Sequence, residues 1–238
     1  MKAIVLAAGR GERMRPLSDD TPKPLLEVQG KPLIEWHLEA LAASGVREVV
    51  VNTAWLEERI VDALGNGASF GLQITYSMEG RDHGNALETA GGIAKALPLL
   101  GDAFWVVSAD VYVPGFRFSA RTADEFVASG RLGRLWLVPN PHFHPRGDFG
   151  VGADGMGLAD TTGPDGQRWT YANIALLRAE MFSTIVPGTK APLAPLLYAG
   201  MRERRIGVEV WRGKWANVGT PEQLVELNAQ PSPPRLSS

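Results

Sequence analysis

The strongest constraint on the fold is a regular alternation of apolar and amphipathic segments in the first half of the chain. Buried strands are predicted by apolar runs at 2–8, 48–52, 72–76 and 103–108. Helices are predicted between them by apolar residues at helical spacing, at 32–44, 55–64 and 89–97. This alternation favours a parallel or mostly parallel sheet whose ligands bind at the carboxyl ends of its strands. Asp110, just after the fourth run, is expected at that edge.

The second half of the chain continues the pattern less regularly. Strands are expected at 134–138, 169–177 and 206–211, and helices at 192–201 and 221–227. Thr220 suits the N-cap of the last helix. One α/β domain is ordinary for 238 residues. We therefore expect one domain over 1–229, with halves of about 1–112 and 113–229, and a disordered tail at 230–238.

Composition excludes several classes of protein. Without cysteine there are no disulfides, thiolate metal sites or cysteine nucleophiles, and a cytoplasmic location is the default expectation. A net charge of -2 argues against a nucleic-acid partner. No apolar run approaches the roughly 18 residues of a membrane span, so no membrane partner is expected.

The first glycine-rich loop carries the clearest chemical signal. A predicted strand runs directly into Leu6-Ala7-Ala8-Gly9-Arg10-Gly11-Glu12-Arg13-Met14. Glycines let backbone N–H groups approach and hold phosphate oxygens, although a tight strand-to-helix turn would also explain a bare pair of them. The segment fits two better-known phosphate loops poorly. A dinucleotide fingerprint would need a third glycine where Met14 stands, and a Walker A loop would need Gly-Lys-Ser/Thr, which is absent.

A lysine between two prolines strengthens the phosphate interpretation. In Thr21-Pro22-Lys23-Pro24-Leu25 the prolines are expected to keep the segment extended, with Lys23 exposed. A lysine held in this way can place a point charge on a phosphate at a small entropic cost. Lys23 is therefore predicted to act on the same anion as the glycine loop.

These segments resemble a known enzyme family. L-A-A-G-x-G-x-R-M followed by T-P-K-P-L is similar to the signature of sugar-1-phosphate nucleotidylyltransferases. Ser108-Ala109-Asp110 and Trp215-Ala216-Asn217-Val218-Gly219-Thr220 resemble two further family segments, so the resemblance spans nearly the whole chain. It implies an α/β, Rossmann-like, glycosyltransferase-A-like domain with a mixed, mostly parallel sheet flanked by helices. Residues 1–112 would form a nucleotide-binding half and residues 113–229 a sugar-phosphate-binding half.

Two short segments indicate a branch of this family. Residues 87–92 (LETAGG) and 146–149 (RGDF) look most like N-acetylmuramate-1-phosphate uridylyltransferases of peptidoglycan recycling. The implied partners are a nucleoside triphosphate, UTP first, and a sugar 1-phosphate. Sister guanylyl- or thymidylyltransferases, a catalytically silent nucleotide-binding module and a degenerate dinucleotide-dependent oxidoreductase remain alternatives. A monomer or weak dimer is expected.

The resemblance also implies roles for individual residues. Arg13, Lys23 and Asp110 would be catalytic. Nucleotide contacts are predicted for Leu6, Ala7, Ala8, Gly9, Gly11, Glu12, Arg13, Lys23, Glu88, Thr89, Ala90 and Gly91. Sugar-phosphate contacts are predicted for Ser108, Asp148, Asn173 and Lys190.

The metal site departs from the family pattern. The resemblance implies that Asp110 and position 217 bind Mg²⁺, yet residue 217 is asparagine where the family usually has aspartate. Magnesium commonly takes one or two carboxylates and completes its shell with phosphates and water, so Asp110 with a triphosphate meets that minimum. The acceptor phosphate, with a second pKa of about 6, needs no general base. We expect its direct in-line attack on the α-phosphorus.

One further pattern is set aside. His142-Phe143-His144 could place two imidazoles on one side of a strand, as in a metal site. Pro141 and Pro145 flank it and no clear third ligand follows, so an ordinary loop is favoured.

Overall fold

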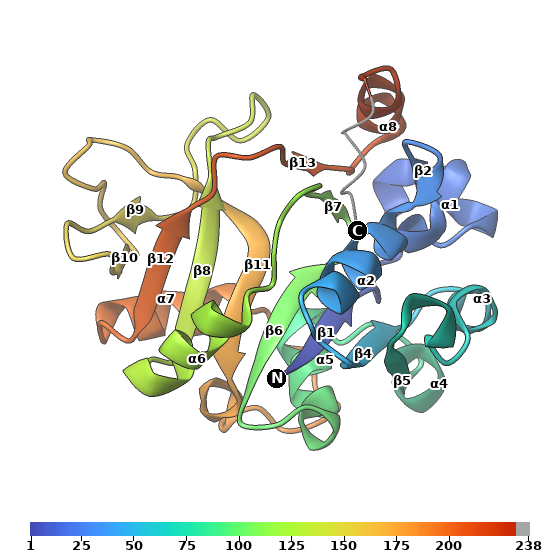
Figure 1. Ribbon diagram of the computed structural model, residues 1–238, viewed down its shortest axis with the longest axis horizontal. Helices are drawn as coiled ribbons and strands as arrows, with labels where there is room; N and C mark the ends of the chain where they lie inside the picture. Colours follow the sequence, from blue (N-terminus) through green and yellow to red (C-terminus); the bar gives the residue numbers. More distant parts are fainter. Residues whose placement is uncertain (232–238) are drawn as a thin grey trace.

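A seven-stranded sheet forms the centre of the protein in a computed structural model that describes residues 1–231 (Figure 1). Of the tail expected at 230–238, residues 232–238 lie outside the described residues. The strand order is β12-β8-β11-β6-β1-β4-β5. The bounds are β1 Lys2–Leu6, β4 Glu48–Thr53, β5 Gln73–Met78, β6 Ala103–Ser108, β8 Gly133–Val138, β11 Thr170–Arg178 and β12 Ile206–Val210.

The sheet is mixed and mostly parallel, as the alternation predicted. β6, β1, β4 and β5 run parallel, and β12 runs parallel to β8. β11 is antiparallel to both of its neighbours, β6 and β8. The apolar runs at 2–8, 48–52 and 103–108 all became central strands because they are buried on both faces.

Helices cover both faces of the sheet. The longer ones are α2 Leu33–Ala43, α3 Glu57–Leu64, α5 Glu88–Ala96, α6 Ala120–Ser129, α7 Ala194–Arg202 and α8 Pro221–Asn228. The Thr220 hydroxyl caps α8 by accepting from the Gln223 N–H, as expected. Helix α6 was not predicted from the sequence, although Ser119 caps its start and Gly130 follows its end at φ 66°.

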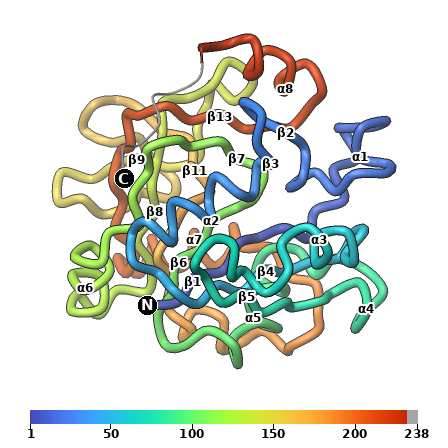
Figure 2. Tube along the Cα trace, turned by 45° about the vertical axis from the view of Figure 1, so that its right-hand side comes forward, coloured from blue at the N-terminus to red at the C-terminus, as the bar shows by residue number. Residues whose placement is uncertain are grey.

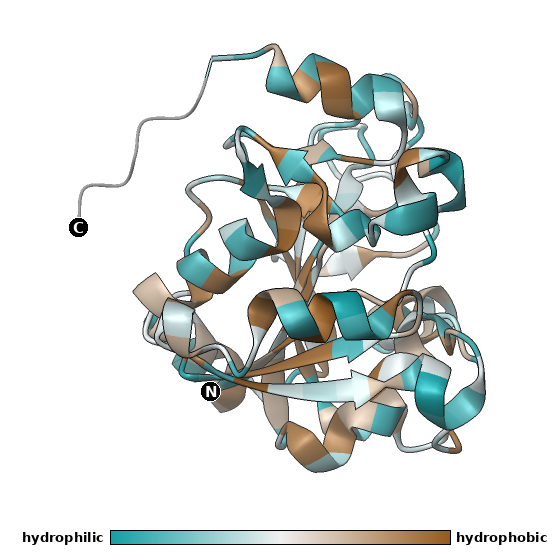
Figure 3. Cartoon of the chain, turned by 90° about the vertical axis from the view of Figure 1, so that its right-hand side faces the viewer, coloured by the Kyte–Doolittle hydropathy of each residue, from teal (hydrophilic) through white to brown (hydrophobic). Residues whose placement is uncertain are grey.

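Two apolar clusters lie on opposite faces of the sheet, and β6 contributes to both. Trp105 and Val107 join a cluster with residues of α2, α3 and α6. Phe104 and Val106 point the other way, into a cluster with residues of α5 and α7. In Figure 3 the strands carry many hydrophobic residues, in brown, and the helices alternate between hydrophobic and hydrophilic residues.

The C-terminal part of the chain returns to the N-terminal part. β13 (Ala216–Asn217) pairs with β7 (Val111–Tyr112), and α8 lies beside β2 (Glu27–Val28), as Figure 2 shows. The Asn228 side chain donates to the Glu27 carbonyl at 3.1 Å. This return brings the 215–220 segment to the carboxyl ends of the central strands. Within residues 1–231 no helix has the length and apolar character needed to cross a membrane.

Candidate functional site

The glycine loop leaves β1 at the carboxyl edge of the sheet. Gly11 has φ 68°, a conformation that favours glycine, and its carbonyl accepts from the Ser18 hydroxyl at 2.7 Å. The backbone N–H groups of Gly9, Arg10 and Gly11 make no hydrogen bond within residues 1–231. Unused N–H groups in a row are the kind of donors that bind phosphate oxygens.

Lys23 lies directly against this loop. It is 8% exposed, and its Nζ contacts Asp110 Oδ2 at 3.0 Å. A Cβ added at Gly11 would come within 3.2 Å of the Lys23 Cβ. The glycine loop, the lysine and the aspartate therefore meet, although 87 residues separate Lys23 from Asp110.

Two expectations for Lys23 were wrong. The side chain is buried instead of exposed, because an ion pair with Asp110 compensates its charge. The segment is also not extended throughout: Pro22 is (φ −57°, ψ 137°), but Lys23–Leu25 forms a 3₁₀ turn. Pro24 disfavours a helical turn at Lys23, the residue before it. The turn forms nevertheless, because the Leu25 and Leu26 N–H groups donate to the carbonyls of Pro22 and Lys23, at 2.8 and 3.1 Å.

A first cavity of about 610 Å³ opens over the loop. Residues predicted for the nucleotide or for catalysis line much of it: Leu6, Ala7, Ala8, Gly9, Gly11, Glu12, Arg13, Lys23, Glu88, Thr89 and Asp110. Asn52 and Gly219 also line it, and neither was predicted to do so from the sequence. Gly219 lies beside Arg13, since a Cβ there would be 3.5 Å from the guanidinium Nη2.

The start of α5 borders this cavity in a strained conformation. Glu88 has φ 61°, which is uncommon for a side-chain-bearing residue and often marks a functional position. Ala90 and Gly91 were predicted to contact the nucleotide, but they line neither this cavity nor the one beside it. Their N–H groups both donate to the Ala191 carbonyl, at 2.9 and 3.0 Å.

A second cavity of about 570 Å³ shares Leu6, Glu88, Thr89 and Ser108 with the first. Asp148, Asn173 and Asn217 line it as well. Lys190, predicted for the sugar phosphate, is exposed and lines neither cavity, so its role stays a prediction. Aromatic residues that were given no role from the sequence complete the wall: Phe143, Phe149, Tyr171, Tyr198 and Trp215.

Asp148 and Asn173 are held in place by different means. The Asp148 carboxylate accepts from the Tyr171 N–H at 2.8 Å, and its Oδ1 lies 3.0 Å from His144 Nε2. Asn173 has φ 58° within an irregularity of β11, where the register shifts between Tyr171 and Ala175. β-Bulges of this kind redirect side chains next to functional sites. His144 belongs to the loop expected at 142–144, and its Nε2 contacts Asp148.

Asp110 and Asn217 approach each other where the two cavities meet. Asp110 lines the first cavity and Asn217 the second, and the Val218 N–H donates to the Asp110 carbonyl at 2.9 Å. The Asn217 Oδ1 is a buried acceptor without a hydrogen-bond partner among the described residues. Residues 1–231 hold no cluster of three or more His, Cys, Asp or Glu side chains suited to a metal. One carboxylate and one free amide oxygen nevertheless fit the oxygen preference of Mg²⁺.

Comparisons with known proteins identify the family of this chain. The family described as nucleotidyl transferase matches residues 2–151. An N-acetylmuramate alpha-1-phosphate uridylyltransferase of Neisseria meningitidis is 46% identical over 96% of this chain and 97% of its own length. The protein of the same name from Caulobacter vibrioides is 31% identical over 96% of both chains.

A solved structure supports the fold. A Bacillus anthracis protein described as a glucose-1-phosphate thymidylyltransferase superposes with a TM-score of 0.80 at 20% identity, covering 96% of this chain and 94% of its own. The glycine loop, Lys23 and Asp110 all lie within the matched residues 2–151. The chain belongs to the nucleotidyl transferase family.

Proposed function

We propose that the protein transfers UMP from UTP to N-acetylmuramate 1-phosphate, forming a UDP-sugar and pyrophosphate. The names of the Neisseria and Caulobacter relatives, which match over nearly their full lengths, support this choice of substrates. The structural observation that carries it is the pair of cavities with a shared wall, which suits two substrates that react with each other.

The two halves of the chain supply different cavities. Apart from Gly219, the lining of the first cavity comes from residues up to 110, which supports a nucleotide-binding half at about 1–112. Most of the second lining comes from residues 143–217, which supports a sugar-phosphate half at about 113–229. The shared residues Glu88 and Ser108 would contact both substrates.

The triphosphate would lie on the glycine loop. Free N–H groups from Gly9 to Gly11 would donate to its oxygens, and Arg13 and Lys23 would neutralise its charge. The base would contact the start of α5 at Glu88 and Thr89, with Ala90 and Gly91 acting through the backbone position that Ala191 fixes.

Magnesium would be held by Asp110 and Asn217, whose oxygens face adjoining cavities. When bound, it would neutralise charge on the phosphates of the nucleotide. The hydrogen bond from Lys23 to Asp110 would then be weaker, because the same carboxylate would bind two cations.

The sugar phosphate would bind in the second cavity. Asp148, held by two donors, would accept from sugar hydroxyls, and Asn173 and Ser108 would hold the acceptor in line with the α-phosphorus. A phosphate oxygen forms the new bond to the α-phosphorus as the bond to pyrophosphate breaks. The acceptor is already mostly dianionic near pH 7, so no residue needs to remove a proton.

Pyrophosphate release tests the proposal directly. The purified protein would be incubated with N-acetylmuramate 1-phosphate, Mg²⁺ and one of UTP, dTTP, GTP, CTP or ATP. We expect release with UTP above all others. Release with another nucleotide or sugar phosphate would assign a sister enzyme, and nucleotide binding without any release would assign the silent binding module that Asn217 suggests.

A further inference from the structure

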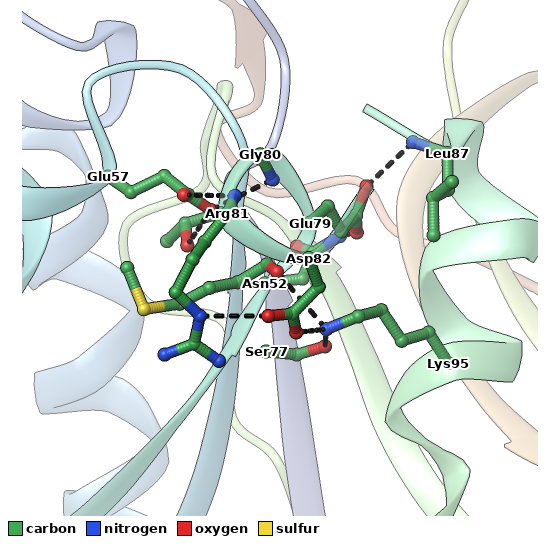
Figure 4. A network of polar contacts seen from close by, with 11 residues as sticks. Asn52, Glu57, Ser77, Glu79, Gly80, Arg81, Asp82, Leu87 and Lys95 are labelled. Carbon is green, nitrogen blue, oxygen red and sulfur yellow. Dashed lines mark hydrogen bonds and ion pairs between the residues drawn. The ribbon is translucent and has the colours of Figure 1, made fainter. Parts of the chain in front are cut away.

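Behind the first cavity lies a carboxylate that the proposed reaction does not use. Glu79, the first residue of α4 (Glu79–His83), is 0% exposed and lines neither cavity. Its Oε1 accepts from Asn52 Nδ2 and its Oε2 from the Leu87 N–H, both at 2.7 Å (Figure 4). Burial raises the pKa of Glu79, although these two hydrogen bonds act to lower it.

Asn52 extends this contact to the glycine loop. It is 3% exposed, and its Oδ1 accepts from the Ala7 N–H at 2.8 Å. A continuous chain of hydrogen bonds therefore runs from Ala7 through Asn52 and Glu79 to Leu87. Ala7 begins the glycine loop, and Leu87 precedes the strained Glu88. Both ends of the chain are backbone groups of segments that line the first cavity or adjoin its lining.

The two donors explain why the residue is a carboxylate. Asn52 Nδ2 and the Leu87 N–H point at different oxygens of Glu79, and a carboxylate accepts at both. A glutamine would accept at one end only and present a donor to the other donor. Glu79 forms no ion pair within residues 1–231, and Lys95 acts on it only from a longer distance. A buried carboxylate without an ion pair is costly, so its presence indicates that both hydrogen bonds matter.

Helix α5 leaves this pair little room to shift. A Cβ added at Gly92 would lie 2.4 Å from Glu79 Oε1 and 2.8 Å from Asn52 Nδ2. The helix backbone therefore packs directly on the two side chains. Their spacing is fixed by contact as well as by hydrogen bonds.

We propose that Glu79 is a positioning residue which, through Asn52 and Leu87, sets the spacing between the glycine loop and the start of α5 and thereby the affinity for the nucleotide. The proposal rests on the proposed function, because it takes the first cavity as the nucleotide site. Glu79 itself touches no substrate.

Glu57 of α3 provides a matched control. Its carboxylate also holds α4, by accepting from the Gly80 N–H at 3.1 Å and the Arg81 N–H at 2.8 Å (Figure 4). Its third donor is the Thr53 hydroxyl at 3.0 Å, and among the described residues it forms no hydrogen bond with Ala7, Asn52 or Leu87. Glu57→Gln thus removes one acceptor for the N–H groups of α4. It leaves the hydrogen bonds from Ala7 through Asn52 and Glu79 to Leu87 in place.

Calorimetric titration with UTP distinguishes the two carboxylates. We expect Glu79→Gln to weaken UTP binding about tenfold or more, because small misplacements of binding groups have effects of that size. Glu57→Gln should stay within about twofold of the unaltered protein. Equal UTP affinity in both variants would overturn the positioning role of Glu79. If the unaltered protein itself bound no UTP, the proposed function would fail, and the positioning role would fail with it.

A second variant removes loss of folding as an explanation. Asn52→Asp alone places a second carboxylate next to that of Glu79, so the two repel each other and the hydrogen bond between them is lost. Combined with Glu79→Gln, the new amide can donate to the new carboxylate while its oxygen accepts from the Leu87 N–H, so every bond of the chain is restored. Glu79→Gln should therefore weaken UTP binding in the original chain and strengthen it in the Asn52→Asp chain. Losses that simply add would overturn the proposal. If Glu79→Gln alone does not fold, the comparison of Asn52→Asp with the double variant still decides: a double variant that binds UTP no more tightly than Asn52→Asp would overturn the proposal.

Discussion

Lys23 Nζ lies 3.0 Å from Asp110 Oδ2, so the cation proposed for the triphosphate and the carboxylate proposed for magnesium bind each other. The Lys23 side chain is 10% exposed and that of Asp110 37%. Each charge compensates the other at the edge of the sheet, where the first cavity begins. A metal ion at Asp110 would compete with Lys23 for the carboxylate and leave the ammonium for the nucleotide phosphates.

Replacing this lysine should damage turnover more than folding. We expect Lys23→Met to lower kcat/KM by about 10²-fold or more, the loss expected for one preorganised electrostatic contact. Stability should fall by only about 1 kcal/mol, because Asp110 can turn toward water. Steady-state kinetics and urea unfolding measure both, with Lys31→Met, from the surface pair with Glu39, as control. Full turnover with a large loss of stability would contradict the role.

Asn217 allows a test of the metal site. Because its Oδ1 is buried without a partner, Asn217→Asp would add a second carboxylate where an oxygen is already free. The Mg²⁺ concentration for half-maximal activity should fall several-fold, and Asp110→Asn should raise it. Chelation of divalent cations should abolish turnover of the original protein, and added Mg²⁺ should restore it. Activity that persists in the chelator would exclude magnesium dependence.

The two loop glycines should respond differently to alanine. A Cβ at Gly9 meets nothing within 4 Å, so Gly9→Ala should fold normally but place a methyl group where phosphate oxygens would bind. Gly11→Ala should lower stability by about 1–2 kcal/mol, because φ is +68° and Lys23 is close. Thermal unfolding and KM for UTP separate the effects. An unchanged KM for UTP in Gly9→Ala would show that the loop does not bind the phosphates of the nucleotide.

Buried His37 predicts a loss of stability in acid. It is 1% exposed, and its Nε2 donates to the Val111 carbonyl at 2.7 Å. Burial lowers the pKa of His37 from 6.5 to about 4, so its contribution is present above pH 6.5 and is lost as the pH falls toward 4. The full difference corresponds to about 3 kcal/mol.

Urea unfolding at pH 7.5 and 4.5 measures this effect. The original protein should lose about 2 to 3 kcal/mol more than His37→Gln, which keeps a donor for Val111 but cannot titrate. The raised pKa of Glu79 acts in the opposite direction, since stability falls as pH rises above its unfolded value of 4.5. That effect is common to both proteins and cancels in the comparison. Equal losses of unfolding free energy in the two proteins would show that the pKa of His37 does not change on unfolding.

Several features followed from the sequence because their signals are local. Ala103–Ser108 is a strand as expected, since an apolar run of six residues predicts a buried strand wherever it lies in the sheet. Thr220 caps α8 because a cap depends only on the next three residues. The glycine loop was identified in the same way, from consecutive residues, and the signature around it indicated the family.

The tertiary structure alone decided how the site is assembled. Lys23 is buried because Asp110, 87 residues away, faces it, and no local pattern encodes that meeting. Asn52 and Glu79 became partners through the order of the strands, and Asn173 was directed into the second cavity by a shift of register in β11. Periodicity and caps act over a few residues, whereas the compensation of a buried charge depends on which distant segments the sheet brings together.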